Sequence, residues 1–157
     1  MNHGNTYTFE NGPNCKGRGA IFGEGATGYT LDSVRLRNNY PEMGQWSVNH
    51  ATAFDVFIVK GGVTLAIRNA LGEVERFELD GTTETPDIPH SHHIPVNTPY
   101  RWEAAGRDTD DGWTELSLVG NPAFTSEQYE VISEEDLLDL ETMMDATDPV
   151  ELVKRGE

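Results

Sequence analysis

The chain has 157 residues, 36% of them hydrophobic, and its formal net charge at pH 7 is −16. This length suits one domain that buries its own apolar core. Because so acidic a surface repels phosphate backbones and anionic lipid, we expect neither nucleic acid nor a membrane as a partner.

The sequence also bears on the compartment. No stretch approaches the roughly 18 apolar residues of a membrane span, and the first residues lack the basic-then-apolar pattern of a signal peptide. Cys15 is the single cysteine, which excludes an internal disulfide and suits a reducing environment. We therefore expect a cytoplasmic protein.

Taken in chain order, short alternating segments predict strands. Residues 5–10 alternate polar and apolar side chains, and residues 29–38 do so again. Between them, closely spaced glycines predict an irregular loop with one small strand at residues 20–22. Residues 45–60 form the longest β-prone run, and a Gly-Gly turn ends it.

The pattern continues to residue 122. Residues 63–68, 73–79 and 113–119 read as further strands, with hairpin turns between them. Seven or more antiparallel strands at short spacing, each with one polar and one apolar face, predict an all-β barrel or two-sheet sandwich.

The C-terminal segment differs in composition. Residues 133–136, Ser-Glu-Glu-Asp, open like a helix capping box, and leucines and methionines follow at roughly helical spacing. We therefore divide the chain into a β-barrel at residues 1–125, with its Gly-rich N-terminal segment, and an acidic helical extension at residues 126–157. The extension is expected to pack on the barrel, or alternatively to form a dimer contact or a lid.

Two segments resemble the sequence motifs of the cupin superfamily. The first family motif is Gly, five residues, His-x-His, three or four residues, Glu, six residues and Gly. Residues 55–62 match its second half, with Asp55 at the glutamate position, and His50 alone or Asn49 and Ala51 at the histidine positions.

The second family motif is Pro-x-Gly, two residues and His. Residues 95–100 match it, with Asn97 for glycine and Tyr100 for histidine, and asparagine tolerates the positive φ of such a turn. The resemblance covers about residues 29–122. It implies a double-stranded β-helix, the jelly-roll cupin barrel.

Cupins usually hold one metal ion inside the barrel at these ligand positions. The best set that this chain offers is His50, Asp55 and Tyr100, in which a further histidine is missing and tyrosine is an uncommon ligand. We therefore expect no cofactor, and a divalent metal is the less favoured alternative.

The histidine cluster His90, His92 and His93 lies away from these positions. His90 and His92 would share one strand face, the spacing that two metal ligands need. They precede Pro95, however, so we expect a solvent-facing, pH-sensitive turn or an adventitious metal site, with His92 the candidate for a role in the pocket.

The resemblance places Tyr100 and Trp102 inside the barrel, opposite Asn49 and Asp55, and His50 joins them if a bulge shifts the strand. We predict His50, Asp55 and Tyr100 as catalytic residues. Imidazole moves protons near neutral pH, a carboxylate fixes its tautomer, and a tyrosine hydroxyl stabilises a developing oxyanion. Alternatively, Tyr100 and Trp102 simply fill a closed core.

The predicted substrate-binding residues surround this set. Trp46, Phe57 and Trp102 would provide flat walls for a ring, and Asn49 and His92 would add polar contacts. We predict a small-molecule enzyme, an isomerase, dehydratase, lyase or cyclase on a sugar-like or polyketide-like substrate, without metal. The alternatives are a non-catalytic ligand-binding or sensing cupin and, less favoured, a metal-dependent oxygenase. The resemblance also implies a homodimer.

Overall fold

The structure is a computed structural model that describes residues 5–10, 13–37, 46–81, 89–124 and 126–132. The helix predicted from residue 133 lies outside these ranges. Within them, no helix has the length and apolar character that a membrane crossing requires.

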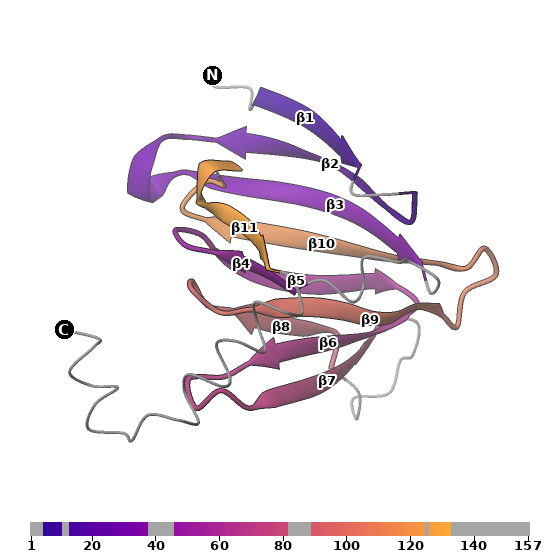
Figure 1. The fold of residues 1–157 in the computed structure, drawn as a ribbon. Coiled ribbons are helices and arrows are strands. Elements are labelled where there is room, and N and C mark those ends of the chain that lie inside the picture. Colours follow the sequence, from indigo (N-terminus) through magenta and orange to yellow (C-terminus); the bar gives the residue numbers. More distant parts are fainter. Residues whose placement is uncertain (1–4, 11–12, 38–45, 82–88, 125, 133–157) are drawn as a thin grey trace.

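Two antiparallel sheets make up the described chain (Figure 1). In sheet order, the first contains β1 (Asn5–Glu10), β2 (Cys15–Phe22), β3 (Tyr29–Arg37), β10 (Trp113–Asn121), β5 (Ala53–Lys60) and β8 (Ser91–Ile94). The second contains β11 (Tyr129–Ile132), β4 (Trp46–Asn49), β9 (Tyr100–Arg107), β6 (Gly62–Arg68) and β7 (Val74–Asp80). Two short 3-10 turns, η1 (Gly25–Thr27) and η3 (Ser126–Gln128), complete the described elements.

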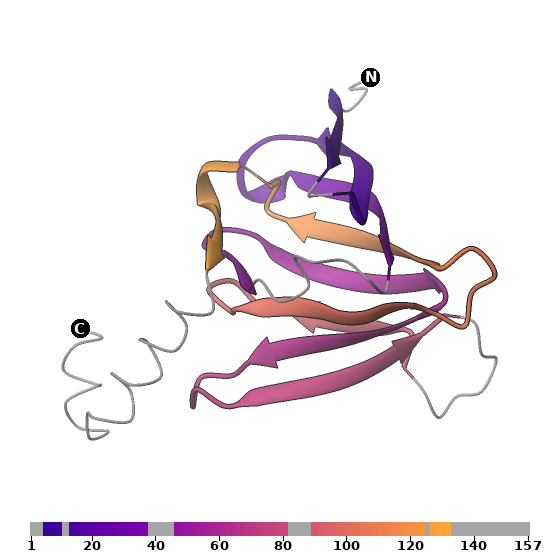
Figure 2. The same cartoon turned by 45° about the vertical axis from the view of Figure 1, so that its right-hand side comes forward.

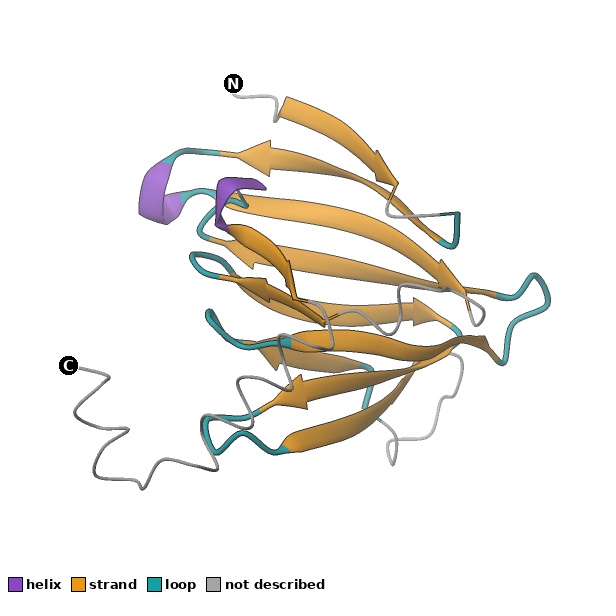
Figure 3. Ribbon diagram, in the orientation of Figure 1, coloured by secondary structure: helices purple, strands orange, loops and turns teal. Residues whose placement is uncertain are grey.

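The strands dominate every view. Figure 3 shows little helix beside them, and Figure 2 shows the β1–β2 hairpin at one end of the molecule and the β6–β7 hairpin at the other. The predicted all-β, two-sheet architecture is therefore confirmed.

Alternation along the strands separates core from surface. On β5, Phe54, Val56 and Ile58 are buried, whereas Asp55 and Phe57 between them are exposed. This period of two places every second side chain of β5 against the opposite sheet.

The long run at residues 45–60 is two strands in different sheets. The side-chain Oδ1 of Asn49 accepts hydrogen bonds from the backbone N–H groups of Ala51, at 3.0 Å, and Thr52, at 2.6 Å. This turn, of the kind that Asn favours, breaks the strand at residues 50–52. β4 therefore joins the second sheet and β5 the first, so the alternation of β4 does not continue into β5.

The two ends of the described chain also differ from expectation. The Gly-rich segment forms a full strand, β2, where we predicted a loop with a small strand at residues 20–22. At the other end, β11 pairs with β4 from Tyr129 to Ile132, so the barrel extends past residue 125.

Candidate active site

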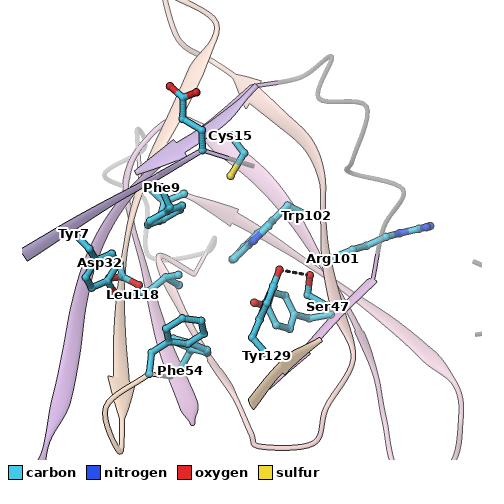
Figure 4. A pocket seen from close by; sticks show the side chains of 14 residues that line it. Tyr7, Phe9, Cys15, Asp32, Ser47, Phe54, Arg101, Trp102, Leu118 and Tyr129 are labelled. Atoms are coloured by element: carbon cyan, nitrogen blue, oxygen red, sulfur yellow. Dashed lines mark hydrogen bonds between the residues drawn. The ribbon is translucent and has the colours of Figure 1, made fainter. Parts of the chain in front are cut away.

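A cavity of about 330 Å³ opens between the sheets where β1, β2 and β3 face β4, β9 and β11 (Figure 4). Seven aromatic side chains line it: Tyr7, Phe9, Phe54, Tyr100, Trp102, Phe124 and Tyr129. The remaining lining residues are Glu10, Cys15, Asp32, Val34, Ser47, Arg101 and Leu118. The cavity is thus apolar and aromatic, with a few polar groups at defined places.

The first polar feature is the pair Tyr7 and Asp32. The Tyr7 hydroxyl donates a hydrogen bond to Oδ1 of Asp32. Asp32 is 7% exposed. Burial raises the pKa of Asp32 above its ordinary value, and the hydrogen bond from Tyr7 opposes that rise. Burial and the adjoining carboxylate also raise the pKa of Tyr7, so its hydroxyl stays protonated.

Two glycines of β2 make this pair possible. Tyr7 and Phe9 of β1 lie opposite Gly19 and Gly17 in the register of the hairpin. A Cβ at Gly19 would collide with the Asp32 carboxylate and the Tyr7 ring, and one at Gly17 would collide with the Phe9 ring. The absent side chains let rings from an edge strand reach across β2 to the barrel interior.

The second polar feature is Tyr100, the first residue of β9. The turn before it contains Asn97 at φ 57°, whose N–H donates to the Asn49 carbonyl at 2.8 Å. Tyr100 is 8% exposed, and its ring stands edge-on to that of Trp102, with 6.1 Å between centroids. Burial raises the pKa of Tyr100, so its hydroxyl stays protonated and is available as a hydrogen-bond donor.

Opposite these groups, Tyr129 of β11 contributes a third hydroxyl. It lies 2.7 Å from Ser47 Oγ in a hydrogen bond, which Figure 4 shows as a dashed line. Phe124 stacks edge-on against the Tyr129 ring, at 5.9 Å, and lies 6.3 Å from the Phe54 ring. These contacts fix a second aromatic wall.

The predicted catalytic residues do not converge. His50 has a side chain 44% exposed, with Nδ1 2.9 Å from Asn97 Oδ1 and Nε2 2.9 Å from Glu130 Oε2. Asp55 is 71% exposed and its Oδ1 lies 2.7 Å from Nδ1 of His93. Of the predicted three, only Tyr100 lines the cavity, and the expected inward placement of the other two is corrected. The break at residues 50–52 is the reason, since it resets which side chains of β5 point inward.

The predicted substrate-binding residues do not all lie at the cavity. Trp102 lines the cavity. Trp46 is 2% exposed but packs with Val48 and Ala66 on the outer side of the second sheet. The side chain of Asn49 accepts a hydrogen bond from Thr52 N–H in the turn. Phe57 is 55% exposed on the outer face of the first sheet.

The histidine cluster lies away from the cavity as well. The His92 ring packs against Phe77 at a tilt of 31°, with 4.0 Å between ring centroids, and His92 is absent from the residues that line the cavity. Burial and the neighbouring charge of His93 lower the pKa of His92. His90 Nδ1 lies 2.5 Å from the Asp80 carbonyl oxygen. The three therefore make separate contacts.

A metal does not fit the positions that the family resemblance marks for it. His50 and Asp55 face solvent with other partners, whereas Tyr100 is buried. Throughout the described ranges, no group of three or more His, Cys, Asp or Glu side chains is arranged to hold a metal ion.

Sequence reasoning missed Asp32, Tyr7 and Tyr129. For Asp32 a signal existed: the alternation of β3 buries Thr30, Asp32 and Val34 on one face, so a carboxylate stands on an apolar face. No local pattern marks Tyr7 or Tyr129, because each reaches the cavity only through the pairing of its strand.

No protein-family model matches the chain, and no curated protein matches it by sequence. Solved structures do match. Pac13 from Streptomyces, described as a nucleoside dehydratase and also solved with uridine, is 16% identical with a TM-score of 0.54, covering 82% of this chain and 85% of its own.

Two further structures have the same fold. A protein from Shewanella oneidensis is 17% identical with a TM-score of 0.63, covering 84% of this chain and 82% of its own. Hydroxypropylphosphonic acid epoxidase from S. wedmorenis is 15% identical with a TM-score of 0.54, covering 74% of this chain and 55% of its own. The chain therefore has a cupin-like β-barrel fold, as predicted.

Proposed function

We propose that this protein is a small-molecule enzyme that carries out acid–base chemistry in the cavity between its sheets, as an isomerase, dehydratase, lyase or cyclase. The buried carboxyl of Asp32 is the observation that carries the proposal. A carboxyl 7% exposed on a cavity wall is costly to the fold, and such groups concentrate at functional sites.

Asp32 takes the role of moving a proton, which we had predicted for His50 and Asp55. Its raised pKa brings the carboxyl nearer to neutral pH, where a group both accepts and returns a proton effectively. The hydrogen bond from Tyr7 orients the carboxyl, leaving Oδ2 as the oxygen that meets the substrate.

Tyr100 keeps the role that its position predicted. Its hydroxyl remains protonated because burial raises its pKa. It would donate a hydrogen bond to a substrate oxygen that gains negative charge, a contribution that is strongest in a site with little water.

The aromatic rings would hold the substrate in place. Trp102 and Phe54 offer flat faces from opposite sheets, and such faces suit the ring of a nucleoside, a sugar or a polyketide-like compound. Pac13, described as a nucleoside dehydratase, supports the idea that a barrel of this fold accommodates dehydration of a ring compound.

We propose that the reaction needs no metal cofactor, because the donor residues of the described chain do not fit one. The alternative of a non-catalytic ligand-binding barrel is favoured by one contact: Tyr7 already satisfies an oxygen of Asp32. A measurement of turnover distinguishes the enzyme from the ligand-binding barrel.

The predicted homodimer remains a proposal. The outer face of the first sheet exposes Leu31, Phe57, Val59 and Val119, at 46%, 55%, 52% and 39%, and a second copy would cover them. Light scattering of the purified protein measures the mass directly.

The function is tested by incubating the protein in deuterated water with uncharged hydroxylated ring compounds, including uridine, and following products by mass spectrometry. We expect loss of water, or deuterium entering a C–H position, with wild type and not with Asp32→Asn. Equal conversion by both proteins would remove Asp32 from the mechanism. Ligand recovered unchanged and without deuterium would support the binding alternative.

A further inference from the structure

The charged residues around the cavity are not balanced. Those that line it, among the described residues, are Glu10, Asp32 and Arg101. Two of the three are acids, of which Asp32 is buried and Glu10 is exposed at the edge, and the base among them has partners elsewhere.

Arg101 directs its charge away from the cavity. Its Nε lies 2.8 Å from Oε2 of Glu103, and its guanidinium carbon lies 4.8 Å from the centroid of the Trp46 ring. Trp46 belongs to the cluster on the outer side of the second sheet. Figure 4 shows the Arg101 side chain extending away from the other labelled residues. The charge of the guanidinium is therefore partly offset by Glu103.

The walls add to this negative character. Aromatic rings carry negative charge on their faces, which attracts cations and tolerates neutral groups but repels anions. Phe9, Phe54 and Trp102 contribute such rings beside the carboxyl of Asp32. Because screening is weak inside a barrel, the carboxylate acts strongly on a bound charge.

We propose that the substrate is a ring compound that carries no phosphate, sulfate or carboxylate group, so that it is uncharged or cationic. The inference rests on the proposed function, in that it takes this cavity as the substrate site. It predicts that phosphorylation or carboxylation of an otherwise acceptable compound abolishes its binding.

A second tryptophan, Trp113, lies next to positive charges and provides a reference for Trp102. The Trp113 ring lies beneath three cations of the outer face, Lys16, Arg35 and Arg37, at 5.0, 4.9 and 4.3 Å from its centroid. Trp102 reports on the cavity, whereas Trp113 reports on these three cations, of which Arg35 is also paired with Asp111 and Glu115. Trp46 is 2% exposed and therefore shielded from solutes, so it adds the same background fluorescence to the measurements on Trp102 and Trp113.

Fluorescence quenching tests the proposal without a known substrate. Trp113→Phe leaves Trp102 as the accessible tryptophan, and Trp102→Phe leaves Trp113. Each variant is titrated with neutral acrylamide, cationic caesium and anionic iodide at constant ionic strength. For Trp102 we expect a caesium quenching constant on the order of fivefold above that of iodide, and for Trp113 the reverse order.

Removal of the buried charge in the cavity separates the local effect from the charge of the whole protein. Adding Asp32→Asn to Trp113→Phe should raise iodide quenching of Trp102, while the same substitution added to Trp102→Phe leaves Trp113 unchanged. Equal quenching of Trp102 by iodide and caesium, with acrylamide effective, would overturn the charge inference alone. Failure of acrylamide to quench Trp102 would show a closed interior and overturn the proposed function with it.

A second comparison uses three ligands of one shape: benzyl alcohol, benzylammonium and benzoate. Thermal shifts of the wild-type protein should be positive for benzyl alcohol or benzylammonium and absent for benzoate. A shift with benzoate as large as with the other two would contradict the proposal.

Discussion

The two ends of the barrel interior are built differently from the same two sheets. Around β5, β6 and β7 the space is filled by aliphatic side chains, of which Ile58, Leu65 and Leu79 are at most 1% exposed. Around β1, β4 and β11, aromatic rings and hydroxyl groups leave a cavity of about 330 Å³. One end supplies close packing, and the other supplies room for a ligand.

The difference follows from the residue types. Branched aliphatic side chains interdigitate and leave few gaps. At the hollow end, large rings are instead held by hydrogen bonds, Tyr7 to Asp32 and Tyr129 to Ser47, and these bonds keep the rings on the walls. If the proposed function is right, substitutions at the packed end should affect stability and substitutions at the hollow end should affect activity.

The largest expected effect is on the chemistry of the hollow end. Asp32→Asn should lower kcat/KM by about 10²–10⁴-fold, because an amide cannot exchange the proton. The rate of turnover, or of deuterium exchange, measures this loss. A decrease of less than about tenfold would contradict the acid–base role.

At the packed end the effect should appear in stability. Leu65→Ala should lower the free energy of unfolding by about 2–5 kcal/mol, since it leaves a void in a filled core. Leu118→Ala, at the cavity wall, is the matched control and should cost less, because that side chain already borders empty space. Urea titration measures both. An equal cost at the two sites would contradict the distinction between the ends.

Tyr100→Phe should act on rate without a large loss of fold. Removal of the donor from the cavity should lower kcat by about 10²-fold, while the ring continues to pack against Trp102. Tyr29→Phe, at a residue 41% exposed, is the control and should leave kcat unchanged. An unaltered kcat in Tyr100→Phe would indicate that this ring only fills the barrel.

The pH dependence of stability should reveal the burial of Asp32. Its folded pKa is raised above the ordinary 3.8, so the folded state holds the proton more tightly than the unfolded state does. The contribution of Asp32 to the free energy of unfolding therefore decreases as pH rises from 3.8 through the raised pKa. At pH values above the raised pKa, the full destabilisation by the buried carboxylate is present. Asp32→Asn should consequently melt higher than wild type at pH 7, with a smaller difference near pH 4. A Tm difference of the opposite sign at pH 7 would show that the Tyr7 bond outweighs burial.

The smallest effect is expected on the outer face. Asp55→Asn removes a carboxylate that is 71% exposed and paired with His93, so the free energy of unfolding should change by less than about 0.5 kcal/mol. Its activity should equal that of wild type. A loss of activity comparable to that of Asp32→Asn would indicate that the active site lies at the residues predicted from the family motif.

Much of the fold could be predicted because alternation and turn residues are local signals. The strands β3, β6 and β7 begin and end within about two residues of the predicted ranges, and Asn97 adopts the positive φ expected of its turn. β2 could not be predicted, because its glycines are explained only by the rings of β1 that lie over them.

The site was predicted in part. Tyr100 and Trp102 follow from the second motif and its strand. His50 and Asp55 were placed inward because the break at residues 50–52 depends on one side chain, Asn49, which folds back onto the backbone. Tyr7 reaches the cavity across the glycines of its hairpin partner β2, and Tyr129 reaches it through the pairing of β11 with the distant strand β4, which no local pattern encodes.

A crystal structure of the protein with a bound uncharged ring compound tests the central claim, that the hollow end is the active site. We predict density for the ring between Trp102 and Phe54, with a ligand oxygen within hydrogen-bond distance of Asp32 and Tyr100. Ligand density at His50 and Glu130, or at Asp55 and His93, with the cavity left empty, would contradict it.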